Sequence, residues 1–339
     1  MGDNYDGSFD ITTLDNGGGD ESSEMARDIK SGLLSEPKDI SPWPKYLYDD
    51  EGSRLFEEIT DLPEYYQTRT EFSILEERAA EIIKRSGCRE IVELGSGSST
   101  KTRALLEAML EASGGDGARY SPLDVSKGIL KESGEKLDEE YADLDVHGYV
   151  GDFDGSLGQV FDDRDGRDDD EAGSRLVLFL GGTIGNFTPE KRGEFLREIR
   201  SGLASGDHVL VGLDLVKDKN TLEAAYDDSA GVTAKFNKNV LKVLNDKLGA
   251  DFDPSLFEHR ATYNEEMERI EMWLDSHVSQ TINVSGLDVR FEAGEGMRTE
   301  MSHKFTEKSV RRTFEGAGLE LTELYTDERS LFGLALAGL

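Results

Sequence analysis

The stretch of sequence that decides the fold runs from residue 91 to residue 103 and reads IVELGSGSSTKTR. Its apolar start predicts a short strand at 91–94, and Gly95 and Gly97 predict a tight turn after it. The hydroxyls at 98–100 suit the N-cap of a helix that begins there. In α/β sheets, a strand, a glycine turn and a helix in this order form a nucleotide cradle beyond the carboxyl end of the strand. On this stretch alone, a purely structural strand–turn–helix stays open.

The spacing of the glycines separates this turn from two other nucleotide-binding motifs. A dinucleotide fingerprint, Gly-x-Gly-x-x-Gly, needs a glycine at position 100, where the chain has Thr100. The Gly-Lys-Ser/Thr of a phosphate-binding P-loop does not occur. An acid just before the glycines, here Glu93, instead resembles the pattern of S-adenosylmethionine (SAM) methyltransferases.

Outward from this turn, strands and helices alternate in the rhythm of a mainly parallel sheet. We expect strands at 90–94, 119–124, 145–150, 175–180 and 207–214, with helices at 99–112, 126–140 and 189–202. After Asp214 the rhythm changes, which predicts helices at 220–230 and 232–248 and antiparallel strands within 258–303. A helix at 306–317 and strands at 319–325 and 331–337 then return to the first pattern. The predicted fold is therefore α/β, with a second unit inserted before the last helix and strands.

The chain is strongly acidic, because its 339 residues include 38 Lys and Arg against 71 Asp and Glu, a formal net charge of −33. Such a surface repels nucleic acid and anionic membranes, so neither is an expected partner. At about 1 M salt the Debye length is about 3 Å, and the self-repulsion is largely screened. The composition therefore indicates a halophilic source, although an ordinary acidic protein stays open.

Other features of the composition predict a cytoplasmic, metal-free protein. Cys88 is the single cysteine, so there is no internal disulfide or thiolate zinc site, and the five histidines lack metal-ligand spacing. No apolar run approaches the roughly 20 residues that span a bilayer, and the start of the chain lacks a signal-peptide pattern. Residues 1–34 are polar and rich in Gly, Asp and Ser, which predicts disorder.

Polar residues suited to a nucleoside follow three successive predicted strands. Asp124 ends the second strand and can accept both ribose hydroxyls of an adenosyl group, although it could instead cap the next helix. Asp152 and Phe153 follow the third strand and suit the amino group and the face of an adenine ring. Because Gly95 follows the first strand, we expect these residues along one edge of the sheet.

Two further places carry side chains suited to an amino acid. Asn186 follows the fourth strand and offers both a donor and an acceptor for a head group, although an asparagine that only forms a turn is equally consistent. Glu300 and Ser302 are two residues apart, so on a strand they share one face. A carboxylate beside a hydroxyl could grip a ring with two nitrogens, but a solvated edge strand would look the same.

Taken together, the chain from about Tyr48 onward closely resembles the histidine-specific Nα-methyltransferase family, whose members make hercynine for ergothioneine synthesis. The resemblance rests on long, unusual strings: YDDEGSRLF at 48–56, LPEYYQTRTE at 62–71, VELGSGS at 92–98, GTIGNF at 182–187, DLVKD at 214–218, AAYDD at 224–228 and RTEMSHKF at 298–305. It implies a Rossmann-like SAM-binding domain at 70–215 and 305–339, and an α+β substrate domain at 35–69 and 216–304.

The resemblance also implies a reaction and a set of site residues. The reaction is trimethylation of the α-amino group of L-histidine, and the expected protein is a monomer. The residues implied to hold SAM are Tyr48, Gly95, Lys101, Asp124, Asp152 and Phe153. Those implied to bind the substrate are Tyr65, Asn186, Tyr226, Met272, Glu300 and Ser302, with Tyr65 and Asn186 in catalytic roles.

Three rival interpretations can be separated from this one. An enzyme of the same fold could methylate another aromatic amino acid such as tryptophan, but Glu300 and Ser302 argue against an apolar ring. A non-catalytic SAM-binding regulator would need no amino-acid pocket, and the intact Tyr65, Asn186 and Tyr226 count against it. A nicotinamide oxidoreductase fails on the missing third glycine.

Overall fold

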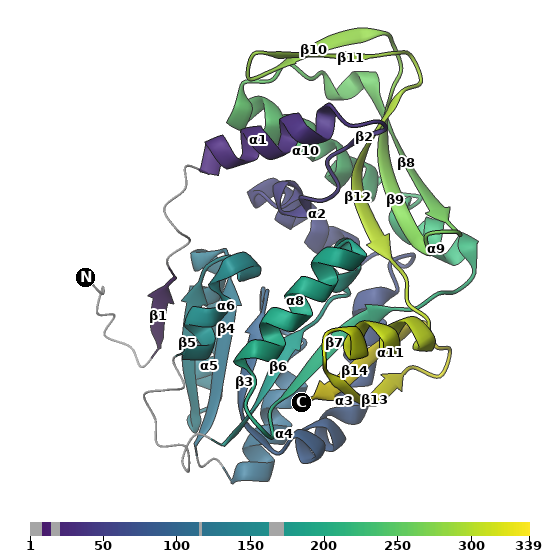
Figure 1. Cartoon of the computed structure of the whole chain (residues 1–339). Helices are drawn as coiled ribbons and strands as arrows, with labels where there is room; N and C mark the ends of the chain where they lie inside the picture. The colour runs from purple at the N-terminus through teal and green to yellow at the C-terminus, as the bar shows by residue number, and fades with distance from the viewer. Residues whose placement is uncertain (1–8, 15–20, 115–116, 163–172) are drawn as a thin grey trace.

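The computed structural model describes residues 9–14, 21–114, 117–162 and 173–339 and has two units. The larger unit is built around an eight-stranded sheet (Figure 1). The order across the sheet is β1 (Asp10–Thr13), β5 (Leu144–Val150), β4 (Ala118–Asp124), β3 (Cys88–Leu94), β6 (Ser174–Phe179), β7 (His208–Asp214), β14 (Phe332–Gly338) and β13 (Glu320–Thr326). In this order, the strands from β1 to β7 run parallel to one another, whereas β14 is antiparallel to both of its neighbours, β7 and β13.

Helices cover both faces of this sheet, as the continuous apolar strands predict. In β6, Leu176 and Leu178 pack into the core on one face, whereas Val177 and Phe179 pack into the core on the other. The first face is covered by α3 (Gln67–Ser86), α4 (Arg103–Ser113) and α5 (Lys127–Glu140). The second face is covered by α6 (Phe153–Asp162), α8 (Pro189–Gly202) and α11 (Glu307–Gly316).

The second unit has its own sheet and its own apolar core, and occupies the upper part of Figure 1. Its sheet has the order β2 (Lys38–Asp39), β12 (Gly296–His303), β9 (Arg269–Ser276) and β8 (Phe257–Asn264), beside a hairpin of β10 (Gln280–Val284) and β11 (Leu287–Phe291). Its helices are α1 (Glu21–Leu33), α2 (Asp50–Thr60), α9 (Lys219–Tyr226) and α10 (Val232–Leu248). Short 3-10 helices are η1 (Pro44–Leu47), η3 (Thr183–Asn186) in the larger unit, and η4 (Pro254–Leu256).

The two chain segments that lead into and out of residues 216–304 run side by side. Leu215, directly after β7, forms a parallel bridge with Phe305, which follows β12. The Val216 amide also donates to the Phe305 carbonyl at 2.9 Å. The insertion therefore starts and ends at nearly the same point of the larger unit.

The predicted disorder of residues 1–34 is wrong where the structure places β1 and α1. The segment is polar overall, but Met25, Ile29 and Leu33 recur every four residues and are buried in the core of the second unit. Residues 1–8 and 15–20 lie outside the described residues.

The predicted helix start at 98–100 is also wrong, because α4 begins only at Arg103. Ser99 adopts a φ of 54°, which belongs to a turn, and the Thr102 hydroxyl donates to the Glu93 carboxylate at 2.7 Å instead of capping the helix. Within the described residues, no helix is both long enough and apolar enough to cross a membrane.

Candidate active site

One cavity is lined by residues of both units. From the larger unit come the turn after β6, with Gly181 and Gly182, and Asn186 in η3. The cavity contains every residue that the sequence predicts for the substrate, together with Tyr48: Tyr65, Asn186, Tyr226, Met272, Glu300 and Ser302. The structure thus brings these side chains together, while their individual roles stay predictions.

Aromatic rings form one wall of the cavity. The ring of Tyr48 lies edge-on to Phe56 and Phe236, with centroid distances of 5.5 and 5.4 Å. Tyr65 packs against Phe56 at 6.1 Å and against Tyr226 at 6.3 Å. The resemblance implies that Tyr48 lies beside the methionine part of SAM; in the structure Tyr48 lines the cavity, and its contact with the cofactor stays a prediction.

Glu300 lies in this cavity with an unsatisfied carboxylate oxygen. It is buried on β12 opposite Met272 of β9, just after a bulge in the strand pair. Its Oε2 atom has no hydrogen-bond partner among the described residues. Burial raises the pKa of Glu300 to about 7, and the Lys304 ammonium counteracts only part of that rise. A ligand that donates an N–H would satisfy this oxygen, because an unpaired buried polar atom is costly.

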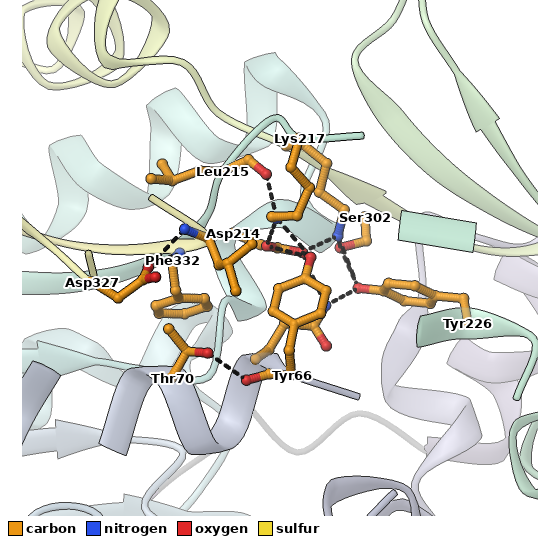
Figure 2. Close-up of polar contacts among 12 residues, drawn as sticks. Tyr66, Thr70, Asp214, Leu215, Lys217, Tyr226, Ser302, Asp327 and Phe332 are labelled. Atoms are coloured by element: carbon orange, nitrogen blue, oxygen red, sulfur yellow. Dashed lines mark hydrogen bonds and ion pairs between the residues drawn. The ribbon is translucent and has the colours of Figure 1, made fainter. Parts of the chain in front are cut away.

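Ser302, which lines the cavity, belongs to a hydrogen-bonded network (Figure 2). Its Oγ accepts from the Tyr226 hydroxyl at 2.9 Å and from the Lys304 ammonium at 2.8 Å. The Tyr226 oxygen itself accepts from Lys304 at 2.9 Å and from Gln67 Nε2 at 3.0 Å. A direct contact from the Tyr226 hydroxyl to a substrate, as the resemblance implies, would have to displace one of these bonds.

Asp214 at the end of β7 holds the network together. Its carboxylate accepts from the Tyr66 hydroxyl at 2.8 Å, from Gln67 at 2.9 Å, and pairs with Lys217 at 2.5 Å and Lys304 at 2.8 Å. Burial alone would raise the pKa of Asp214, but the two lysines hold it below its usual value. Asp214 is therefore an ionised carboxylate at neutral pH.

The sequence did not single out any member of this network apart from Tyr226 and Ser302. The others lie inside strings that carry the resemblance, but their spacing along the chain assigns them no chemistry. Only the fold brings together the start of α3, the end of β7 and the end of β12, which supply Tyr66, Gln67, Asp214, Lys217 and Lys304.

The predicted cofactor residues gather at the carboxyl ends of β3, β4 and β5. Gly95 has a φ of 73°, and a side chain there would meet no atom within 4 Å, so the backbone is open to a ligand. Asp124 accepts hydrogen bonds from the Gly97 amide and from the Ser126 amide, both at 2.9 Å, so its carboxylate stabilises the glycine turn. Asp152 follows β5 and lies 3.7 Å from the Lys45 ammonium.

Lys101 connects this region to the cavity. It pairs at 2.5 Å with Glu71 of α3, a carboxylate with no exposed surface. The other oxygen of Glu71 accepts from the Gly181 amide at 2.7 Å, and Gly181 lines the cavity. Glu71, which the sequence did not single out, therefore positions both Lys101 and the turn after β6.

Phe153 is the first residue of α6, but its side chain lies outside the part of the chain that the structure describes. Glu93 is buried and binds Thr102 and Tyr120, and burial raises its pKa to about 7. Glu93 therefore stabilises the glycine turn through its hydrogen bonds with Thr102 and Tyr120. Across the described part of the chain, no group of three His, Cys, Asp or Glu side chains could hold a metal ion.

Comparisons with known proteins agree with this geometry. Residues 25–339 match the model of a family described as histidine-specific methyltransferase, SAM-dependent. The chain belongs to this family. This methyltransferase is 48% identical to the histidine N-alpha-methyltransferase of Mycolicibacterium smegmatis over 92% of its own length and 94% of that protein. It is 43% identical to the Mycobacterium tuberculosis enzyme of the same name over 94% of its own length and 97% of that protein.

A more distant relative carries a different substrate in its name. The methyltransferase is 28% identical to the L-tryptophan methyltransferase trpM of Psilocybe serbica, over 90% of each chain.

The family as a whole is SAM-dependent, and the residues at the strand ends fit that cofactor. The open turn at Gly95 admits it, the Asp124 carboxylate suits ribose hydroxyls, and the Lys101 ammonium suits the methionine carboxylate.

Proposed function

We propose that this methyltransferase transfers methyl groups from SAM to the α-amino group of L-histidine, three times in succession, to give hercynine and to release S-adenosylhomocysteine each time. The observation that carries the proposal is the buried, unsatisfied carboxylate oxygen of Glu300 beside Ser302 in the shared cavity. An imidazole ring offers one N–H and one bare nitrogen, which match a carboxylate and a hydroxyl. Hercynine is the precursor of ergothioneine in this family's pathway.

The reaction needs position more than a strong base. SAM supplies an electrophilic methyl group, and an α-amino group with a pKa near 8 is partly neutral at pH 7. Tyr65 and Asn186 would hold the amine and the carboxylate of histidine, so that the amine points toward the methyl group of SAM. Burial keeps the pKa of Tyr65 well above its usual value, so its hydroxyl keeps its proton and acts by hydrogen bonding. Orientation of two reactants contributes about 7–11 kcal/mol to such a step.

Tryptophan is the alternative substrate that the trpM relative suggests. An indole ring has one N–H but no ring nitrogen that accepts a hydrogen bond, so it could satisfy Glu300 and not Ser302. A site built to hydrogen-bond a polar group rejects an analogue that lacks it, because its buried polar groups are left unpaired. The cavity therefore favours histidine.

Mass spectrometry tests the proposal. The protein is incubated with SAM and free histidine, or tryptophan, in concentrated KCl. We expect histidine to gain one, two and three methyl groups on the α-nitrogen and tryptophan to gain none. Glu300→Ala should raise the KM for histidine at least about tenfold, the cost of one lost charge-assisted hydrogen bond.

The matched control is Glu258→Ala on the exposed side of β8, in the same sheet. It should leave the KM for histidine unchanged. Methylation of tryptophan in place of histidine, or a Glu300→Ala enzyme with the KM of the unmodified protein, would refute the substrate assignment.

The surroundings of the enzyme form a second part of the proposal. We infer that it works as a monomer in the cytoplasm of a halophilic cell, without nucleic acid or membrane partners. The net charge of −33 supports this, because it disfavours contact with polyanions and is tolerated best where salt screens it.

A further inference from the structure

We propose that Lys304 is a positioning residue that fixes the Ser302 hydroxyl as a hydrogen-bond donor, so that the site accepts the histidine side chain only as neutral imidazole. The single N–H of the ring then points at Glu300, and its bare nitrogen at Ser302. This inference rests on the proposed function, because it concerns the protonation state of that substrate.

The side chain of Lys304 has no exposed surface. Its ammonium donates to the Asp214 carboxylate at 2.8 Å, to the Tyr226 oxygen at 2.9 Å and to Ser302 Oγ at 2.8 Å. An ammonium has three N–H donors and no acceptor. All three protons are therefore committed, and Lys304 occupies one lone pair on each of the two hydroxyls.

Gln67 occupies the second lone pair of Tyr226. Its amide nitrogen lies 2.9 Å from Asp214 and 3.0 Å from the Tyr226 oxygen. An ionised carboxylate only accepts hydrogen bonds, so the nitrogen rather than the oxygen of this amide faces Asp214. The Tyr226 oxygen then receives two hydrogen bonds, and its own proton goes to Ser302 (Figure 2).

Ser302 therefore has one hydrogen-bonding option left. Its oxygen accepts from Lys304 and from Tyr226, which uses both lone pairs. The hydroxyl proton remains, and Ser302 lines the cavity. A ring nitrogen placed against Ser302 must accept that proton, so it cannot itself carry one.

Glu300 accounts for the other ring nitrogen. Its Oε2 atom lies buried without a partner, and it lines the same cavity two residues before Ser302 on β12. A neutral imidazole satisfies both groups, whereas an imidazolium would direct its second N–H at an oxygen with no free lone pair. Besides Lys304, the titratable groups that surround this pair come from four other places in the fold. They are Asp214 at the end of β7, Tyr226 of α9, Tyr65 before α3 and Tyr48 after η1.

Nitrogen NMR of bound histidine tests the inference directly. Histidine labelled with 15N in its ring is added to the protein with S-adenosylhomocysteine at about pH 5.5, where free imidazole, with a pKa near 6.5, is mostly protonated. We expect one protonated and one bare nitrogen in the bound ring. Two protonated nitrogens would overturn the inference and leave the proposed function intact, whereas no bound histidine at any pH would overturn both.

Affinity gives a second measure. Because the free ring loses its neutral form below pH 6.5, the affinity of the unmodified protein for histidine should fall at least about tenfold between pH 7.5 and 5.5. Lys304→Met frees a lone pair on Ser302, so an imidazolium can bind, and the fall should be smaller than in the unmodified protein, with the part that comes from protonation of Glu300 retained. Lys304→Met with the unmodified pH dependence would overturn the role of Lys304.

Lys217→Met is the matched control. Lys217 also pairs with Asp214, at 2.5 Å, and is also buried, but it donates to Tyr66 and not to Ser302 or Tyr226. It should keep the pH dependence of histidine binding. Ser302→Ala removes the donor without disturbing the ion pair, so it keeps the test valid if Lys304→Met does not fold. It should reduce the pH dependence in the same way, and a fall as large as in the unmodified protein would overturn the inference.

Discussion

At the scale of single residues, Glu300 shows how a side chain suited to binding can weaken the fold. Its pKa rises to about 7 in the folded protein because of burial, against about 4.3 in an unfolded chain. The folded state therefore carries a penalty that is absent below about pH 4, grows between about pH 4.3 and about pH 7, and stays constant above that. Glu300→Gln removes the buried charge, and should raise the free energy of unfolding by about 1–3 kcal/mol at pH 8.

Denaturant unfolding of both proteins between pH 5 and pH 8 checks this expectation. The difference should shrink toward pH 5, because the penalty decreases as the pH approaches the unfolded pKa of about 4.3 and both states hold the proton. Glu258→Gln, at an exposed position of β8, should show no pH-dependent difference. A Glu300→Gln protein that is less stable at pH 8 would contradict the assignment of a buried, unpaired carboxylate.

Candidate site residues could be predicted from the sequence only where the side chain lines the cavity. Tyr65, Asn186 and Glu300 lie in the cavity as expected. Glu71 and Lys304 act through other residues, and neither carries a periodic pattern that would mark it. Their importance appears only when α3, β3 and β6, or β7 and β12, are brought together in space.

At the scale of elements, β1 is held in place by a close fit between one ring and one helix. Phe9, just before β1, packs against α5, and a methyl group at Gly134 would lie 2.3 Å from its ring. Gly134→Ala should therefore displace Phe9 and release β1 from β5, although alanine by itself favours a helix by about 1 kcal/mol over glycine. The steric conflict decides the sign at this site.

Hydrogen exchange of the amides at 10–13 measures this release, and we expect it to accelerate at least about tenfold. Gly128→Ala is the matched control in the same helix, because a methyl group there has its nearest neighbour at 4.0 Å. It should leave the exchange unchanged. Unchanged exchange in Gly134→Ala would contradict the packing of Phe9.

Most elements followed from local pattern, and the exceptions have physical causes. The strands from β3 to β7 were predicted to within a residue or two because they are apolar runs bounded by turns. By contrast, β1 and α1 were missed because their stabilisation comes from distant partners, β5 for the strand and the core of the second unit for the helix. The start of α4 was misplaced because the Thr102 hydroxyl serves Glu93.

At the scale of the whole molecule, charge controls stability. A formal charge of −33 produces self-repulsion that opposes the compact state. Raising KCl from about 0.1 M to about 1 M shortens the Debye length from about 10 Å to about 3 Å. We therefore expect the Tm to rise by about 5–15 °C over this range, as measured by thermal unfolding.

A charge variant separates screening from other effects of salt. Glu258, Glu265 and Glu328 are exposed, so replacing all three by glutamine lowers the repulsion without touching the core. The triple variant should unfold at a higher temperature in low salt and gain less from added KCl. A Tm that does not depend on KCl in the unmodified protein would argue against a halophilic origin.

The bridge between Leu215 and Phe305 bears on how such an enzyme can change its substrate in evolution. Because both ends of the 216–304 segment meet at one point, a segment of different length or sequence can be exchanged there with little cost in loop closure. The exchange is not free of conditions, since α1 and α2 supply part of the core on which that segment folds. A new specificity that arises by recombination would therefore require the segment that encodes α1 and α2 to be exchanged together with the 216–304 segment. Single substitutions among the residues that line the cavity need no such coordination.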